Sequence, residues 1–272
     1  MGKFLITPEQ LWSCLAGLNP PRIVDVRRHE IFASDNHLVP GAVWRDHRQT
    51  ESWQTEFDAG AELVIYCVHS HNVSQLAAAQ LRSNGLRARI LKDGIEAWRE
   101  AGLPLLKKST LPLTFERGPS VWVTRRRPKI DRLACPWLIK RFIDPRAKIL
   151  FVDPDHVLAV AEETGGISFD IEGAEISHEG DLCSFDVLLR RCGLKDATLD
   201  DLALIIRGAD TARFDLADEA AGLLATAIGI SALAGEDDHL ALARGMDLYD
   251  NLYAWRRKAP SEMHNWPSVA RS

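Results

Sequence analysis

Short, uninterrupted apolar runs alternate with helix-like segments through the first hundred residues. Apolar runs of this length are typical of strands that are buried on both faces of a parallel sheet. The runs occupy residues 22–27, 62–67 and 89–91. Helical segments are expected at 8–15, 74–81 and 94–101. Because strands alternate with helices, this part of the chain is predicted to be an α/β domain with a parallel sheet.

The pattern changes near residue 107. Periodicity is lost and prolines accumulate over residues 107–119, which we interpret as a linker. Beyond it, strands are expected at 121–123 and 148–152, and helices at about 130–142, 157–164, 184–192, 199–208, 218–228 and 238–257. The second domain is therefore expected to be helix-rich α+β. The predicted organisation is a first domain (1–106), the linker (107–119), a second domain (120–260) and a tail (261–272).

Composition places the chain among ordinary globular proteins. It has 272 residues, of which 46% are hydrophobic and 26% charged. This excludes collagen-like and wholly disordered proteins, and no apolar run reaches the length of about 18 residues that a membrane span needs. We expect no secretory leader at the N-terminus and no membrane partner.

Charge is distributed unevenly along the chain. Residues 107–148 carry 12 basic and 3 acidic side chains, whereas residues 149–272 carry 10 basic and 23 acidic ones. A positive segment of this kind either attracts an anion or forms ion pairs with the acidic remainder. Both interpretations stay open.

The five cysteines are scattered, at positions 14, 67, 135, 183 and 192. An odd number without a Cys-x-x-Cys pair indicates reduced thiols, and we expect a cytoplasmic protein. Cys67 stands out because it ends a predicted buried strand and precedes a helix. Backbone N–H groups at such a position stabilise a thiolate and a bound anion. A buried, inert cysteine is an equally reasonable interpretation.

Four segments in the first domain resemble the rhodanese-like family. They are Ile23-Val24-Asp25-Val26-Arg27, Val39-Pro40-Gly41-Ala42, Val64-Ile65-Tyr66-Cys67 and Lys92-Asp93-Gly94-Ile95-Glu96-Ala97-Trp98. The resemblance covers residues 5–106 and implies the parallel-sheet fold. In that family the cysteine at the position of Cys67 carries a persulfide and transfers sulfur, so the resemblance implies a sulfur donor and a thiol acceptor as partners.

The loop after Cys67 departs from the family pattern. It is one residue longer than in most of the family, and Val73 stands where an arginine would hold a larger oxyanion. His69 and His71 are then the titratable groups able to favour the thiolate or to hold an anion when protonated. Two solvated histidines are the alternative. The expected loop and anion-binding residues are His69, Ser70, His71, Asn72 and Ser74.

Long segments of the second domain resemble the C-terminal domain of the chromate-resistance protein family. They are Thr124 to Ile139, Ser177 to Asp186, Ile206 to Ala212 and Met246 to Asp250. The family is linked to chromate resistance, and some of its members are chromate-responsive regulators. The resemblance does not supply a chemical step.

Five cations occur within eight positions before and at the start of the helix expected near residue 130. Of these, Arg125, Arg127 and Arg132 are candidate ligands for a small oxyanion, because arginines beside a helix N-terminus favour anions. Internal ion pairing is the alternative. Nucleic acid is a disfavoured partner, since the domain is otherwise acidic and has no evident helix-turn-helix.

His178, Asp131 and Asp210 lie in three of these segments and are candidate metal ligands. One histidine with carboxylates suits a divalent metal such as Mn, Fe or Zn. Alternatively, arginines neutralise the carboxylates, with Arg132 as the expected partner of Asp131. Two functions follow: a rhodanese-like sulfurtransferase linked to chromate resistance, with Cys67 as nucleophile or persulfide carrier, or a non-catalytic regulator that senses an oxyanion or metal through the second domain.

Overall fold

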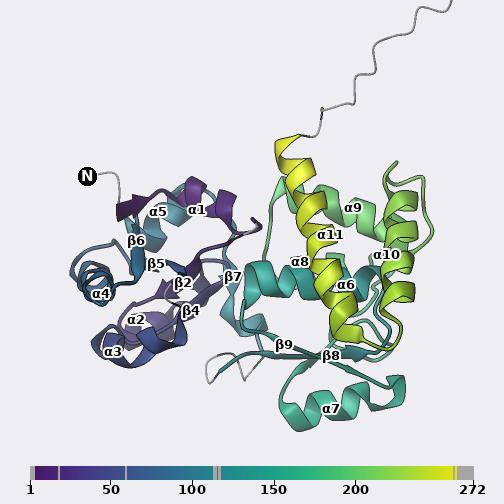
Figure 1. The fold of residues 1–272 in the computed structure, drawn as a ribbon, viewed down its shortest axis with the longest axis horizontal. Helices are drawn as coiled ribbons and strands as arrows, with labels where there is room; N and C mark the ends of the chain where they lie inside the picture. Colours follow the sequence, from purple (N-terminus) through teal and green to yellow (C-terminus); the bar gives the residue numbers. More distant parts are fainter. Residues whose placement is uncertain are drawn as a thin grey trace, which may run out of the picture.

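The fold is taken from a computed structural model of the whole chain. It describes residues 4–17, 19–58, 60–112, 115, 118–259 and 261. Two domains lie side by side, with helix α11 running along the second (Figure 1). Within the described ranges, no helix combines the length and the apolar character that a membrane crossing requires.

The first domain is built on a parallel five-stranded sheet, as the apolar runs predict. In spatial order its strands are β1 (Leu5–Ile6), β6 (Arg87–Leu91), β5 (Glu62–Tyr66), β2 (Arg22–Asp25) and β4 (Ala42–Trp44). The helices are α1 (Pro8–Cys14), α2 (His29–Ser34), α3 (Thr50–Trp53), α4 (Asn72–Ser83) and α5 (Gly94–Glu100), with short 3-10 turns η2 (His47–Gln49) and η3 (Gln54–Glu56). Successive β5 side chains enter different cores: Val64 belongs to the core that includes α1 and α5, whereas Ile65 belongs to a separate core that includes α4.

The second domain is helix-rich with a small parallel sheet, also as predicted. Its strands are β10 (Ile167–Ser168), β8 (Val121–Arg125) and β9 (Lys148–Val152), in that order. Its helices are α6 (Ile130–Leu138), α7 (Val157–Thr164), α8 (Ser184–Cys192), α9 (Ala197–Asp210), α10 (Ala220–Ala234) and α11 (Asp238–Lys258), with a 3-10 turn η6 (Pro154–His156). The end of the helix expected at 130–142 differs from the prediction, because α6 widens into a π-helix, η5 (Ile139–Ile143). Helix α7 covers one face of the sheet and the other helices gather on the opposite side (Figure 1).

The two domains share one hydrophobic core. Trp12 of α1 packs against Phe142 of the π-helix, with ring centroids 5.4 Å apart. The indole N–H of Trp12 also donates to Asp196 Oδ2 (3.1 Å), just before α9. A second contact joins the backbones, because the N–H of Gly41 donates to the carbonyl of Phe142 (2.8 Å). The domain boundary is therefore a packed interface.

The expected linker is partly structured. Its first residue, Lys107, lies in β7 (Leu106–Lys107), which pairs antiparallel with β3 (His37–Leu38). A 3-10 turn η4 (Lys108–Thr110) follows, and Phe115 is buried. Residues 113, 114, 116 and 117 of the linker, and the predicted tail apart from residue 261, lie outside the described residues.

Candidate metal centre and thiol loop

Three carboxylates converge on one imidazole nitrogen in the second domain. We call Asp131, Asp170, His178 and Asp210 the acid cluster. His178 Nε2 lies 3.1 Å from Asp210 Oδ2, 3.5 Å from Asp170 Oδ1 and 3.6 Å from Asp131 Oδ2. These side chains come from the first turn of α6, from the segment just after β10, from a loop and from the last residue of α9. Folding thus gathers the three predicted metal ligands and adds Asp170.

Asp131 is the most deeply buried member of the cluster. Its side chain is 1% exposed. The N–H of Ser184, at the start of α8, donates to Asp131 Oδ2 (2.7 Å). The other carboxylate oxygen, Oδ1, is buried and accepts no hydrogen bond from the described residues. A buried oxygen without a partner is costly unless a cation or a proton satisfies it.

Asp170 connects the cluster to an arginine. Arg132 Nη1 donates to Asp170 Oδ2 (3.1 Å), and the Ser184 hydroxyl donates to Oδ1 (2.9 Å). The expectation that Arg132 neutralises Asp131 is therefore wrong, because its guanidinium is directed at Asp170. Arg132 Nε remains buried without an acceptor among the described residues. One buried donor and one buried acceptor are thus unsatisfied at the same site.

The protonation equilibria of the cluster follow from burial and mutual repulsion. Burial, followed by the charges of Asp210 and Asp170, raises the pKa of Asp131 well above its ordinary value. Burial and Asp170 also raise the pKa of Asp210. Burial opposes ionisation of Asp170, but hydrogen bonding to His178 and the charge of Arg132 outweigh it and lower its pKa. The hydrogen bond with Asp170, helped by the other carboxylates, raises the pKa of His178 to about 9.

The backbone around the cluster adopts strained conformations. Asp170 has φ 54° and Ile130, directly before Asp131, has φ 24°. A positive φ is unusual for any residue with a side chain and especially for a β-branched one. Such strain persists where surrounding contacts hold it and is concentrated at functional sites. Here, the hydroxyl of buried Tyr249 donates to the Ile130 carbonyl (3.0 Å).

The arrangement meets the requirements of a metal site by ligand type and spacing. Asp131, Asp170 and His178 each offer a ligand atom within 4.8 Å of the others. A nitrogen with carboxylate oxygens suits Mn, Fe or Zn. Sequence reasoning missed Asp170 because it lies in a turn-rich stretch without a spacing motif. Its position just after a parallel strand is the signal that was available.

The five other described arginines of the segment 107–148 divide into two groups. Arg126, Arg141 and Arg146 pair with Asp153, Asp250 and Asp144, at 2.8, 2.5 and 3.0 Å respectively. Internal ion pairing therefore accounts for part of the positive charge. Arg125 and Arg127 are exposed, and among the described residues neither guanidinium has a carboxylate within 4.0 Å. Arg125 acts electrostatically on Arg132, so it lies on the side of the acid cluster.

Cys67 immediately follows β5 of the first domain, as predicted. It is buried, and its Sγ lies 3.3 Å from the hydroxyl of Ser74 in the first turn of α4. His69 and His71 are exposed and adjacent, with ring centroids 5.8 Å apart. Asn72 is also exposed. A buried thiol is thus followed in the loop by two exposed imidazoles.

The loop is fixed to the elements beside it. The hydroxyl of buried Ser70, whose φ is 52°, donates to the carbonyl of Leu91 in β6. On its other side, the N–H of Ile95 in α5 donates to the Cys67 carbonyl (3.1 Å). Gly94 approaches the loop so closely that an added Cβ would lie 2.5 Å from the same carbonyl oxygen. Partly buried Val73 packs into the core.

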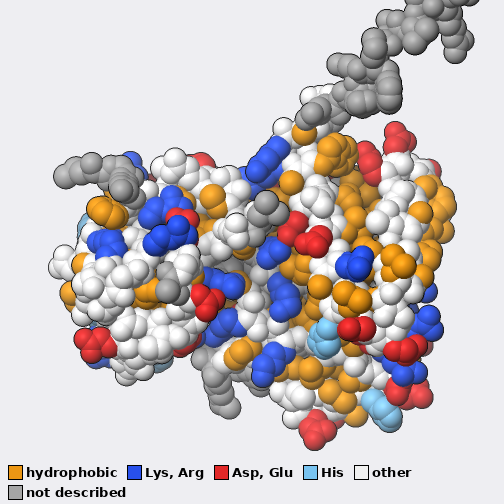
Figure 2. Space-filling model, in the orientation of Figure 1, with side chains coloured by type: hydrophobic (Ala, Val, Ile, Leu, Met, Phe, Trp, Pro, Cys, Tyr) orange, Lys and Arg blue, Asp and Glu red, His pale blue; other side chains and the backbone are white. Residues whose placement is uncertain are grey.

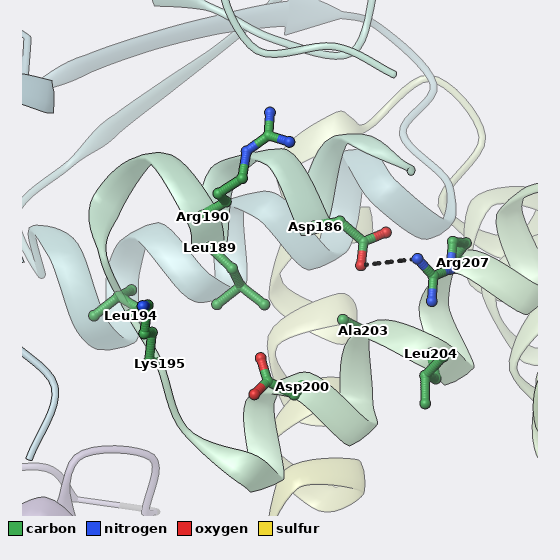
Figure 3. Close-up of a pocket in the computed structure, with 9 residues that line it drawn as sticks. All are labelled: Asp186, Leu189, Arg190, Leu194, Lys195, Asp200, Ala203, Leu204 and Arg207. Atoms are coloured by element: carbon green, nitrogen blue, oxygen red, sulfur yellow. Dashed lines mark ion pairs between the residues drawn. The ribbon is translucent and has the colours of Figure 1, made fainter. Parts of the chain in front are cut away.

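A separate pocket of about 520 Å³ lies between α8 and α9 (Figure 3). Leu189 and Ala203 form part of its apolar floor, and Asp186 faces Arg207 across it at 3.6 Å. Asp186 also accepts a hydrogen bond from the N–H of Cys183 (3.0 Å). The same two helices reach the acid cluster, because Ser184 of α8 donates to Asp131 and Asp170, and Asp210 is the last residue of α9.

Comparison with known families supports both parts of this description. Residues 7–101 match the family model described as "Rhodanese-like domain". Residues 122–256 match the model described as "ChrB, C-terminal domain".

Two curated relatives show the same relationship for parts of their lengths. The chain is 38% identical over 138 residues to Protein ChrB of Cupriavidus metallidurans, covering 48% of this chain and 39% of that protein. It is 42% identical over 59 residues to the uncharacterized protein slr1261 of Synechocystis, covering 21% of this chain and 32% of that protein. The chain thus spans less than half the length of either relative.

Solved structures similar to this chain cover about a third of it. A rhodanese-related protein from Thermoplasma volcanium is 19% identical, with 37% of this chain and 95% of that chain aligned and a TM-score of 0.33. A rhodanese-like domain protein from Staphylococcus aureus is 26% identical, with 35% and 89% aligned and a TM-score of 0.32.

Proposed function

Because residues 7–101 are a rhodanese-like domain and residues 122–256 are a ChrB C-terminal domain, we propose that this chain acts in chromate resistance through a metal centre in its second domain. The acid cluster holds a divalent ion of the Mn, Fe or Zn class, with Asp131, Asp170 and His178 as ligands and Asp210 beside them. A small oxyanion is the proposed partner of the bound ion.

The observation that carries this proposal is the convergence of carboxylates on His178 Nε2 around a buried, unpartnered Asp131 oxygen. Without a metal, three carboxylates face two cations, His178 and Arg132, so the carboxylates are in excess, and burial raises the pKa of Asp131. Asp131 and His178 would hold a divalent ion in their deprotonated forms, and the ion would supply a partner for the free Asp131 oxygen. Metal binding at such ligands therefore releases protons.

The same site offers positive charge for an oxyanion. Arg132 Nε is a buried donor without an acceptor among the described residues, and Arg125 and Arg127 lie in the segment that leads into α6. A bound metal supplies Lewis acidity toward an anion oxygen. The arginines orient the remaining oxygens, since guanidinium groups suit planar, charged hydrogen bonding.

Elemental analysis with thermal unfolding tests the metal centre. The full chain is purified without chelator, analysed for bound metal, then stripped and reloaded with Mn, Fe(II) or Zn. We expect about one equivalent of metal and a melting temperature that rises on reloading, because a ligand bound only to the native state stabilises it. His178→Gln should lose both effects, whereas His156→Gln, an exposed histidine in η6, should keep them. A metal-free protein whose melting is indifferent to chelator and to added metal contradicts the proposal.

A second candidate function rests on Cys67. The thiol lies at the end of a parallel strand and beside the first turn of α4, where helix N–H groups favour an anion. We propose that the Cys67 thiolate attacks the outer sulfur of a donor such as thiosulfate. A new S–S bond forms, the S–S bond of thiosulfate breaks, and sulfite leaves with its electron pair. An acceptor thiolate then takes the outer sulfur of the persulfide.

Intact-protein mass spectrometry tests this step. After thiosulfate treatment, the wild type should gain the mass of one sulfur atom, and Cys67→Ser should not. Cys192→Ser is the matched control, because Cys192 is a buried cysteine of the second domain. Replacing His69 and His71 by Asn should weaken the response to thiosulfate more at about pH 6 than at about pH 8, because only a protonated imidazole attracts an anion by its charge. If the wild type gains no sulfur but still binds metal, the result favours the alternative function, a non-catalytic regulator that acts through the second domain.

A further inference from the structure

The boundary between the two domains contains a positively charged pocket, distinct from the acid cluster. On the face shown in Figure 2, basic side chains gather where the two domains meet. A pocket of about 130 Å³ opens at this boundary, and its cations are Arg22 from β2 and Lys140 and Arg141 from the π-helix. We propose that this pocket binds a small tetrahedral oxyanion, of the phosphate or sulfate class, between the domains.

The charges that line the pocket are not balanced. Arg141 is neutralised by Asp250, whose carboxylate accepts from Nη2 (2.5 Å) and Nε (2.9 Å). Lys140 Nζ donates to the carbonyl of Ala147 (2.7 Å), and among the described residues neither Lys140 nor Arg22 has a carboxylate oxygen within 4.0 Å. Two unmatched cations therefore face a pocket whose lining contains no acidic residue.

An adjoining pocket of about 170 Å³ extends the same groove. It shares Arg22 with the first pocket and adds Arg146 and Glu56. Glu56 pairs with Arg45, and Arg146 pairs with Asp144. The carboxylate of Glu56 is therefore already neutralised by Arg45. The positive charges of Arg22 and Lys140 have no such partner among the residues that line the groove.

The position of Lys140 has an electrostatic cost that an anion would relieve. Burial is the main cause that lowers the pKa of Lys140, and the neighbouring charges of Arg141 and Arg22 lower it further against the opposing effect of Asp144. Apolar side chains such as Leu15, Pro21 and Met246 complete the walls. In such surroundings, charge interactions are stronger than in water. A bound dianion would attract the cations and so offset the repulsion between them.

Size and rigidity limit the ligand to a small anion. The first pocket, of about 130 Å³, is large enough for a tetrahedral oxyanion and is smaller than the range of about 300–1,000 Å³ that is usual for larger ligands. The two walls are joined by a hydrogen bond from the N–H of Gly41 to the carbonyl of Phe142. Gly41 makes this contact with a φ of +74°, a conformation that glycine adopts readily. The cations on the second-domain side belong to a π-helix, a feature frequent at functional sites.

Isothermal titration calorimetry of the full chain tests the proposal. Sulfate and inorganic phosphate are titrated in chelator, so that no metal contributes, and sodium chloride of equal ionic strength is the blank. We expect saturable 1:1 binding that weakens about tenfold or more in Arg22→Gln and in Lys140→Met, because each variant removes a charge-assisted hydrogen bond. Lys140→Arg should retain binding. Arg48 is an exposed arginine of the first domain, which also contains Arg22. Arg48→Gln removes one charge there and should bind sulfate as the wild type does.

Three results would overturn the proposal. The first is sulfate binding that is unchanged in Arg22→Gln, a variant of an exposed side chain that should fold normally. The second is an equal loss in Arg48→Gln, which would indicate general charge screening. The third is tighter binding of phenyl phosphate than of inorganic phosphate, which would show that the ligand is an organic phosphoester and not an enclosed free oxyanion.

Discussion

At the scale of single residues, Asp131 is a carboxyl group whose surroundings oppose its ionisation. It is fully buried between two other carboxylates, and one of its oxygens has no partner among the described residues. We predict that Asp131→Asn melts at the same or a higher temperature than the wild type when both are metal-free, because burial and the neighbouring carboxylates raise the pKa of Asp131, and a group whose pKa is raised on folding lowers stability at neutral pH, a cost that a neutral Asn does not have. The same variant should gain no stability from added metal. Differential scanning calorimetry with and without chelator measures both effects, and a large loss of stability in chelator would contradict this account of Asp131.

A second residue-scale prediction concerns Asp35 and pH. Its carboxylate accepts from Arg27 Nη1 (2.6 Å) and Arg99 Nη2, and from the backbone N–H of His37. Burial opposes ionisation, but these donors and charges outweigh it and lower the pKa of Asp35. Since the folded pKa is below the unfolded one, the stabilisation is complete above the unfolded pKa of about 3.9 and is lost as the pH falls through the folded pKa.

Asp35→Asn should therefore destabilise the protein most near neutral pH, and the difference from the wild type should shrink in acid. Chemical unfolding at several pH values measures this difference. Ser34→Ala, at the exposed end of the same helix, is the control. A deficit that does not change with pH would mean that Asp35 acts through packing and not through its charge.

Sequence reasoning was most successful for residues that have a chemical signature. Three members of the acid cluster and Cys67 were predicted because histidine, aspartate and cysteine occur at marked positions in identifiable segments. Asp170 was missed, and the neutralising partner of Asp131 was wrong. Both depend on which side chains β10 and α8 bring together, and these contacts join residues that are far apart in the sequence.

At the scale of elements, the junction between the thiol loop and α5 depends on Gly94. Its φ is +68°, and an added Cβ would lie 2.2 Å from the carbonyl oxygen of Val68 and 2.5 Å from that of Cys67. Gly102, which also has a positive φ (+66°), has open space around the same position. Comparing Gly94 with Gly102 therefore separates the cost of a positive φ, which both share, from the cost of steric overlap, which only Gly94 has.

Gly94→Ala should therefore destabilise the protein more than Gly102→Ala, for which about 1 kcal/mol of conformational cost is expected. It should also change the rate at which iodoacetamide alkylates Cys67, because the overlap displaces the Cys67 loop. Denaturant unfolding and alkylation followed by mass spectrometry measure the two effects. Equal stability losses and equal alkylation rates in the two variants would show that the contact with Gly94 does not position the thiol.

Element boundaries were predictable where the hydrophobic period extends over several turns. The helices α7 and α8 occupy the residues expected from their periodicity, and α9 to α11 agree within a few residues apart from a longer α10. Two-residue strands such as β10 are too short to show a period, and the π-helix follows from packing in the shared core. Local sequence carries little information about either.

At the scale of the whole molecule, charge and packing both join the two parts of the chain. The basic segment forms ion pairs with the acidic remainder, as in the Arg126–Asp153 and Arg141–Asp250 pairs. The shared core was not predictable, because an apolar residue at a domain boundary has the same pattern as one inside a domain. Trp12 looked like part of an ordinary amphipathic helix, yet it packs against a ring more than a hundred residues away.

The shared core predicts that the two domains unfold together. Trp12 is almost completely buried, contacts Phe142 and Trp98, and donates to Asp196. Trp12→Ala should cost about 3–5 kcal/mol, the range for removing a large buried aromatic side chain. Because the side chain contributes to both domains, hydrogen exchange should show protection falling together in β5 of the first domain and α6 of the second. Trp53→Ala, which removes a tryptophan from the separate core against α4, should affect β5 more than α6. If Trp12→Ala lowers protection in β5 while α6 retains the wild-type rate, the domains unfold independently and the boundary is only a contact surface.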